Sequence, residues 1–169
     1  MTVFEFQAGR IETTAELLAH ALATTPADKQ DWRPTLPGSV PTRSAIKQVG
    51  ECVIVNRYFA ALLRGEAADG NPLGQGAPAF ASAEDAGAEL LASARELADT
   101  VRALPDDALD GTVAHWRGPL PVVRALDGPN RNMAYHAGQI NFIQLLAGDS
   151  EYHLPPAQQQ QQQKPSVAP

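Results

Sequence analysis

The chain is 169 residues long, 44% of its residues are hydrophobic and its formal net charge is −6. This length and composition are typical of one globular domain with a sizeable core. A negative chain without a cluster of lysines or arginines is not expected to bind nucleic acid. The single cysteine, Cys52, excludes an internal disulfide framework and a cysteine-rich zinc site.

Neither a secretory leader nor a membrane span is predicted. The first residues lack a basic region followed by an apolar run. No apolar segment approaches the ~18 residues needed to cross a bilayer. We therefore expect a soluble, cytoplasmic protein without a membrane partner.

Three amphipathic helices are predicted in the first two thirds of the chain. The first covers Phe4 to Leu22, where apolar residues recur at helical spacing. The second follows Ser44 as its N-cap, runs to about Arg64 and ends at Gly65. The third follows Ser82 as its N-cap and ends near Leu104.

The links between these helices are irregular. Prolines and a glycine in Asp31–Pro41 exclude regular structure, and we expect Trp32 and Leu36 to cover one end of the core. Residues 66–81 form a crossing loop rich in glycine, proline and alanine.

Between Pro105 and the last helix the helical pattern is interrupted. Thr112–Arg117 predicts a short extended piece, followed by a turn at Gly118–Pro119. Helical spacing resumes from Pro121 to Leu126, and Gly128–Pro129 indicates a kink or a fresh helix start. Asp127 or Asn130 is a candidate cap for that start.

The last helix, residues 132–146, carries the most informative pattern. Its predicted inner face is apolar except at one end, where Asn132, His136 and Gln139 share that face, and Gly148 follows its end. A buried imidazole must be hydrogen-bonded or bound to a metal. This helix therefore presents the candidate functional residues.

Four long helices without a series of strands predict an all-α four-helix bundle with long irregular connections. The long middle loops indicate a topology other than simple up-down-up-down. We assign residues 1–154 to the bundle and residues 155–169, which contain six consecutive glutamines, to a disordered tail.

Glu51 of the second helix and Asn132 and His136 of the fourth are the candidate metal ligands. Side chains four residues apart share one helix face, so Asn132 and His136 can address one ion, and carboxylate with imidazole suits Zn, Ni, Fe or Mn. The alternative is a hydrogen-bonded polar core without metal. Cys52 is interpreted as a small core residue and His20 as solvated.

Several of these residues also carry a family resemblance. Trp32-x-Pro34, Ser44 with Glu51 seven residues later, and above all the run Tyr135–Asn141 resemble the DinB/YfiT superfamily of damage-inducible, metal-dependent proteins. The resemblance spans Phe4 to about His153. It implies a four-helix bundle, usually a homodimer, with a role in the stress response.

The resemblance also implies a metal centre. In that family a histidine of the second helix and a His-x-x-x-His pair of the fourth hold a divalent metal, and characterised relatives use low-molecular-weight thiols as transferases or isomerases. Only His136 matches here, because Glu51 and Asn132 occupy the other two ligand positions. No catalytic residue is assigned. Asn56, Tyr135 and Gln139 are the candidate substrate-binding residues.

Two functional readings stay open at this point. The first is a metal-dependent enzyme of the thiol-transferase type with a modified ligand set. The second is a non-catalytic protein with a degenerate site, which binds a small molecule or acts as a stress-response interaction protein. The roles of His115, Trp116 and His153 are not assigned by the sequence.

Overall fold

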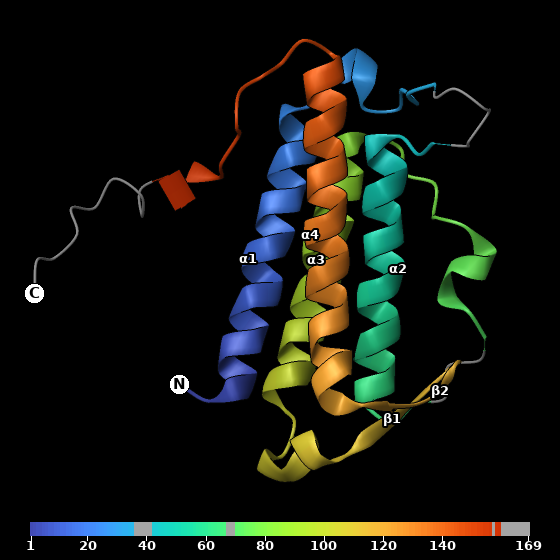
Figure 1. Ribbon diagram of the computed structural model, residues 1–169, viewed down its shortest axis with the longest axis vertical. Helices are drawn as coiled ribbons and strands as arrows, with labels where there is room; N and C mark the ends of the chain where they lie inside the picture. Colours follow the sequence, from blue (N-terminus) through green and yellow to red (C-terminus); the bar gives the residue numbers. More distant parts are fainter. Residues whose placement is uncertain (36–41, 67–69, 157, 160–169) are drawn as a thin grey trace, which may run out of the picture.

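Four long helices dominate the computed structural model, which describes residues 1–35, 42–66, 70–156 and 158–159 (Figure 1). They are α1 (Val3–Thr24), α2 (Ala45–Leu63), α3 (Ala83–Arg102) and α4 (Val122–Leu146). The chain is thus an all-α four-helix bundle, as its sequence predicts. The bounds of α1, α2 and α3 fall within about two residues of the predicted ones.

Side-chain caps begin the helices where the sequence places them. Ser44 accepts a hydrogen bond from the backbone N–H of Lys47, and Ser82 accepts one from that of Asp85. Each bond satisfies a backbone donor that the first helical turn leaves without a partner. Gly65, with φ of 76°, follows α2, because this left-handed conformation favours glycine.

The helices are not connected as a simple up-down-up-down bundle. In Figure 1, α1 and α4 run upward, whereas α2 and α3 run downward side by side. The chain after α2 therefore returns along that helix before α3 begins, and it lies so close that a Cβ on Gly50 would stand 3.1 Å from the side chains of Ala77 and Phe80. α1 packs mainly on α3 and α4, and α2 packs on the same two helices. The predicted departure from simple topology is confirmed.

A β-hairpin joins α3 to α4. Strands β1 (Thr112–His115) and β2 (Gly118–Pro121) pair antiparallel, with His115 opposite Gly118. The predicted extended piece is correct to His115, but the predicted turn at Gly118–Pro119 is wrong. The turn lies two residues earlier, at Trp116–Arg117, and Gly118 with φ of 112° opens the second strand.

α4 begins earlier than predicted and is continuous through Pro129. Pro121 precedes its first turn, so neither Asp127 nor Asn130 is its cap. A proline inside a helix removes one hydrogen bond and crowds the preceding residue. Gly128 relieves part of that crowding because it has no Cβ, and the ring of Phe59 packs where a side chain would stand.

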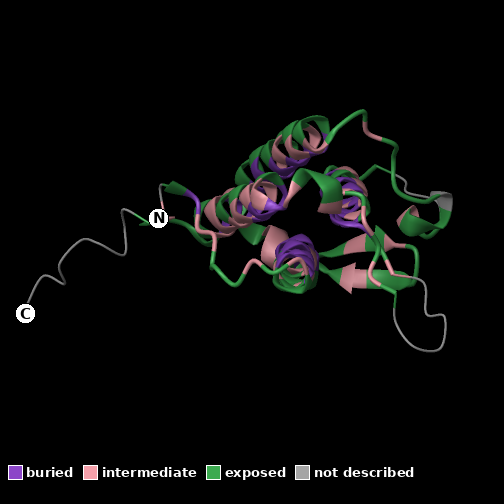
Figure 2. Cartoon of the chain, turned by 90° about the horizontal axis from the view of Figure 1, so that it is seen from above, coloured by how far each residue is buried: buried purple, intermediate pink, exposed green. Residues whose placement is uncertain are grey.

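The inward faces of the four helices form one apolar core, visible as the buried faces that meet in the centre of Figure 2. Its largest fully buried apolar side chains are Ile11, Leu18, Leu22, Leu90, Leu97, Leu126, Met133 and Ile140. Trp32 packs against the edge of this core, as expected, whereas Leu36 lies outside the described residues. Most of the predicted tail also lies outside them. None of the helices in the described part of the chain is long and apolar enough to cross a membrane.

The two faces of α1 provide a direct test of this core. Leu18 is completely buried, whereas Phe6 on the same helix is 50% exposed. Leu18→Ala is expected to lower the free energy of unfolding by about 2–5 kcal/mol, because it removes buried methyl groups and leaves a cavity. Phe6→Ala is expected to lower it by less than about 1 kcal/mol. Urea denaturation measures both, and equal losses would contradict the described orientation of α1.

Candidate metal centre

A polar cluster interrupts the apolar contact between α2 and α4. Gln48 and Glu51 of α2 face His136 and Gln139 of α4, and Asn132 lies one helical turn before His136. His136 therefore contacts two of the other predicted residues, Glu51 and Gln139.

The imidazole of His136 is held through one of its nitrogens. Its side chain is only 2% exposed, and Nδ1 lies 3.2 Å from Oε1 of Gln48 and 2.9 Å from Oε1 of Gln139. The amide N–H of Gln48 donates to the carbonyl of Arg43, which turns the amide oxygen toward the ring. Two oxygen acceptors require Nδ1 to carry the proton. The neutral ring then presents a lone pair at Nε2.

That lone pair faces a carboxylate. Nε2 of His136 lies 3.3 Å from Oε1 of Glu51, yet it has no hydrogen-bond partner among the described atoms. Oδ1 of Asn132 is also buried without a partner in that part of the chain. Unsatisfied buried acceptors are costly, by about 1–3 kcal/mol each. A cation bound to Nε2 of His136 and Oε1 of Glu51 would satisfy the imidazole, and Asn132 lies one helical turn from that position.

The geometry of the cluster fits such a cation. Two ligands bound at about 2.1 Å to one tetrahedral ion stand about 3.4 Å apart, close to the 3.3 Å between Nε2 and Oε1. Histidine ligands commonly donate their other ring N–H to an oxygen acceptor, as Nδ1 does here to Gln48 and Gln139. One nitrogen and two oxygen donors suit a borderline divalent ion.

Glu51 is oriented by a residue outside the helix. Its Oε2 pairs with Arg43 at 2.9 Å, and its side chain is 12% exposed whereas that of Arg43 is 59% exposed. This leaves Oε1 directed at His136. Arg43 thus holds one oxygen of the carboxylate and leaves the other facing the imidazole.

Within the described ranges, no three His, Cys, Asp or Glu side chains gather at one point. A metal at Glu51 and His136 would therefore need the amide oxygen of Asn132 and solvent to complete its coordination. Loss of imidazole ligands weakens binding, because each ligand contributes to the affinity.

The two other predicted substrate-binding residues lie at different depths. Asn56 is fully buried, donates to Oγ of Ser93 and approaches Sδ of Met133, so its contacts are with the core between α2, α3 and α4. Tyr135 is 63% exposed, and its ring meets that of His136 edge-on at 5.3 Å. Of the three candidate substrate-binding residues, Tyr135 and Gln139 therefore contact His136, and Asn56 does not.

Cys52 is not a candidate nucleophile, although it follows Glu51. It is completely buried in the apolar core. Burial raises the pKa of its thiol, and the charge of Glu51 raises it further. A protonated, inaccessible thiol does not react, so the interpretation of Cys52 as a core residue is confirmed.

His115 and His153, which lie outside the helices, do not contact the polar cluster. His153 bonds to Asp149 at 2.7 Å, and this bond lowers the pKa of that carboxyl. His115 stacks on Phe59, which lies about 12 Å along α2 from Glu51. Burial lowers the pKa of His115.

Gln48 and Arg43 are the site residues that sequence reasoning missed. Gln48 lies three residues after Ala45 and four before Cys52, so the helical spacing that identified those core positions also placed it inward. Arg43 precedes the N-cap of α2, where no periodic pattern indicates a direction.

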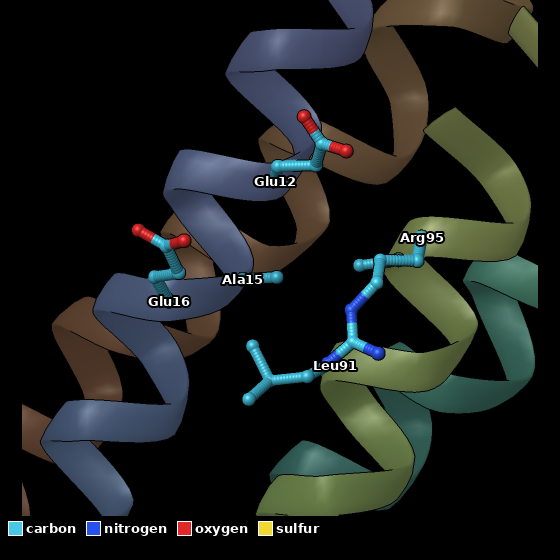
Figure 3. A pocket seen from close by; sticks show the side chains of 6 residues that line it. Glu12, Ala15, Glu16, Leu91 and Arg95 are labelled. Carbon is cyan, nitrogen blue, oxygen red and sulfur yellow. The ribbon is translucent and has the colours of Figure 1, made fainter. Parts of the chain in front are cut away.

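A second hollow lies on the opposite side of the bundle. It has a volume of about 210 Å³ and lies in the groove between α1 and α3 (Figure 3). Glu12 and Glu16 stand on its α1 wall and Arg95 on its α3 wall. It lacks an imidazole and is smaller than typical ligand pockets, so the α2–α4 cluster remains the candidate centre.

The facing acceptors make a testable prediction for the metal-free protein. Glu51→Gln supplies an amide N–H that can donate to Nε2 of His136, at the loss of the ion pair with the largely exposed Arg43. In the presence of EDTA we expect this variant to be about 1 kcal/mol more stable than the wild type in urea denaturation. Glu16→Gln, at an exposed position of α1, is the matched control and should change stability by less than about 0.5 kcal/mol. A less stable Glu51→Gln protein would contradict the assignment of Nε2 as an acceptor.

Comparison with known proteins places this arrangement in a family. No curated protein matches the chain in sequence. The family model described as the DinB superfamily matches residues 10–140, which include α2, the hairpin and the candidate centre. Because this match covers most of the chain, the chain belongs to the DinB superfamily.

Proposed function

We propose that the cluster of Glu51, Asn132 and His136 binds a divalent metal and that the chain is a metal-dependent enzyme of the thiol-transferase type. The observation that carries this proposal is the approach of two acceptors, Nε2 of His136 and Oε1 of Glu51, at 3.3 Å. With the proton of the neutral ring on Nδ1, these two acceptors face each other in a buried site without a donor between them.

Each residue of the cluster would have its own role in the proposed centre. Gln48 and Gln139 hold the imidazole with its lone pair toward Glu51, and Arg43 holds the carboxylate. A bound divalent ion would supply a Lewis-acidic position that lowers the pKa of a coordinated thiol. Tyr135, at the exposed edge of the cluster, is placed to contact a substrate at the surface.

A second candidate function has its own supporting observation. Glu51 already pairs with Arg43, and Nδ1 of His136 is already satisfied by two amides. A cluster with these bonds can persist in the fold as a polar plug, so a non-catalytic, small-molecule-binding or stress-response protein is the alternative. The two functions differ in whether Nε2 acquires a metal.

The homodimer and the stress-response role stay predictions from the family resemblance, and the cytoplasmic location stays a prediction from the sequence. An exposed apolar row on α4 supports the homodimer, because large exposed apolar patches commonly mark protein interfaces. Its members are Tyr135, Phe142, Leu145 and Leu146.

Metal content tests the proposed centre. After loading with Zn, Ni or Mn and dialysis, we expect one ion per untagged chain by mass spectrometry, and loss of that ion in Glu51→Ala and His136→Ala. Asn132→His replaces a weak amide ligand by imidazole and is expected to raise the affinity at least about tenfold. His115→Ala is the matched control and should keep the metal. Equal metal content in His136→Ala and the wild type would contradict the site.

Thiol coordination tests the chemistry. Cobalt(II) accepts the same nitrogen and oxygen ligands, and a thiolate bound to it gives an intense charge-transfer absorption. Adding a low-molecular-weight thiol to the cobalt-loaded protein should produce this band, and His136→Ala should not show it. A cobalt-loaded protein whose spectrum does not respond to thiols would favour the non-catalytic alternative.

A further inference from the structure

A larger cavity lies further along the same α2–α4 seam. Its volume is about 640 Å³, within the range of small-molecule sites. Its walls come from α2, the turn Pro72–Gln75, the hairpin and the first half of α4. Segments far apart in the sequence therefore line this open cavity, and Figure 1 shows the hairpin against the end of α2.

The charge of this cavity is opposite to that of the chain. Arg117, Arg124 and Arg131 line it, with Asp127 as the one carboxylate in its lining. These three exposed arginines form no ion pair with a described residue, unlike Arg43, Arg57, Arg64 and Arg102. Arg10, Arg33 and Arg95 also lack an ion pair, but they do not line this cavity. In a chain of net charge −6, three cations without carboxylate partners mark a place that attracts an anion.

The arginines are positioned by the fold. Arg124 and Arg131 are seven residues apart on α4 and so share one face of that helix. The guanidinium of Arg117 lies 4.5 Å from the centre of the Trp116 ring, which restrains it by a cation–π contact. The backbone N–H of Trp116 donates to the hydroxyl of Tyr58, which ties the hairpin turn to α2.

The other walls are apolar and aromatic. Val55, Phe59, Leu73 and Leu120 contribute apolar surface, and Trp116 is a further aromatic residue of the lining. Apolar walls with a few convergent polar groups are typical of sites for organic molecules. Arginine is suited to carboxylate and phosphate because its planar group donates two parallel hydrogen bonds.

We propose that this cavity binds a small organic anion, with its carboxylate or phosphate on Arg117, Arg124 and Arg131 and its apolar part against Phe59 and Trp116. The cavity adjoins the candidate metal centre, since Val55 lies one helical turn from Glu51 and Arg131 directly precedes Asn132. If the proposed function holds, the ligand is the substrate class of that centre. The binding itself does not require a metal.

Tryptophan fluorescence measures this binding directly. The chain has two tryptophans, so Trp32→Phe leaves Trp116 as the only reporter. The full chain with this substitution is titrated in EDTA with phenylacetate and phenyl phosphate, and with phenylacetamide as the neutral counterpart. We expect saturable changes with the anions and at least about tenfold weaker binding of phenylacetamide. The tighter of the two anions identifies the headgroup.

Charge-matched variants locate the site. Arg124→Gln with Arg131→Gln should weaken anion binding at least about tenfold, whereas Arg95→Gln with Arg33→Gln, which removes two arginines outside the cavity, should change it less than about twofold. Circular dichroism checks that both double variants keep their helices.

Several results would overturn the proposal. Equal affinities for phenylacetate and phenylacetamide would contradict anion binding, and this result needs no arginine variant. The absence of a saturable response to both anions would contradict it as well. Unchanged anion binding after loss of Arg124 and Arg131 would place the anion elsewhere. Because EDTA is present throughout, a negative result here leaves the metal proposal standing, and a failed metal experiment leaves this one standing.

Discussion

The hydrogen bonds at Nδ1 of His136 determine what the α2–α4 seam can do. Two amide oxygens, from Gln48 and Gln139, accept from this one ring nitrogen, and the proton is therefore placed on it. Nε2 is left as an acceptor inside the protein, opposite the carboxylate of Glu51. Each element of the proposed metal centre depends on this one choice of tautomer.

The topology of the bundle brings these groups together. Because the chain returns along α2 before entering α3, α2 and α4 become neighbours that run in opposite directions. The start of α2 then faces the second half of α4, where Glu51 meets His136. The same arrangement places the hairpin beside the end of α2 and encloses the arginine-lined cavity. The contact between α2 and α4 thus carries both sites: the cluster in which Glu51 faces His136, and the cavity lined by three arginines.

The periodic part of this structure could be predicted from the sequence. Helical spacing located all four helices, the caps Ser44 and Ser82 located two starts, and the inward position of His136 followed from its apolar neighbours. Its contact with Glu51 was expected from the family resemblance as well as from spacing. The start of α4 was misplaced because glycine and proline normally interrupt helices, whereas Gly128–Pro129 is accommodated inside one.

Features that depend on contacts between elements could not be predicted in this way. The amide orientation of Gln48 depends on the carbonyl of Arg43, and the arginine-lined cavity depends on how the hairpin folds back onto Tyr58. Neither relation leaves a periodic signal, because the partners lie in loops or are distant along the chain. The bond from the amide of Asn56 to Ser93 of α3 is of the same kind, although the inward position of Asn56 follows from helical spacing.

The protonation state and the ligation of His136 can be observed in one experiment. Long-range proton–nitrogen NMR correlations of the histidine side chains distinguish a protonated Nδ1 from a protonated Nε2 and report metal binding to either nitrogen. In EDTA, His136 should show a protonated Nδ1 and a free Nε2, and addition of zinc should shift the Nε2 signal while Nδ1 keeps its proton. A proton on Nε2 in EDTA, or an Nε2 signal that zinc leaves unchanged, would contradict the account.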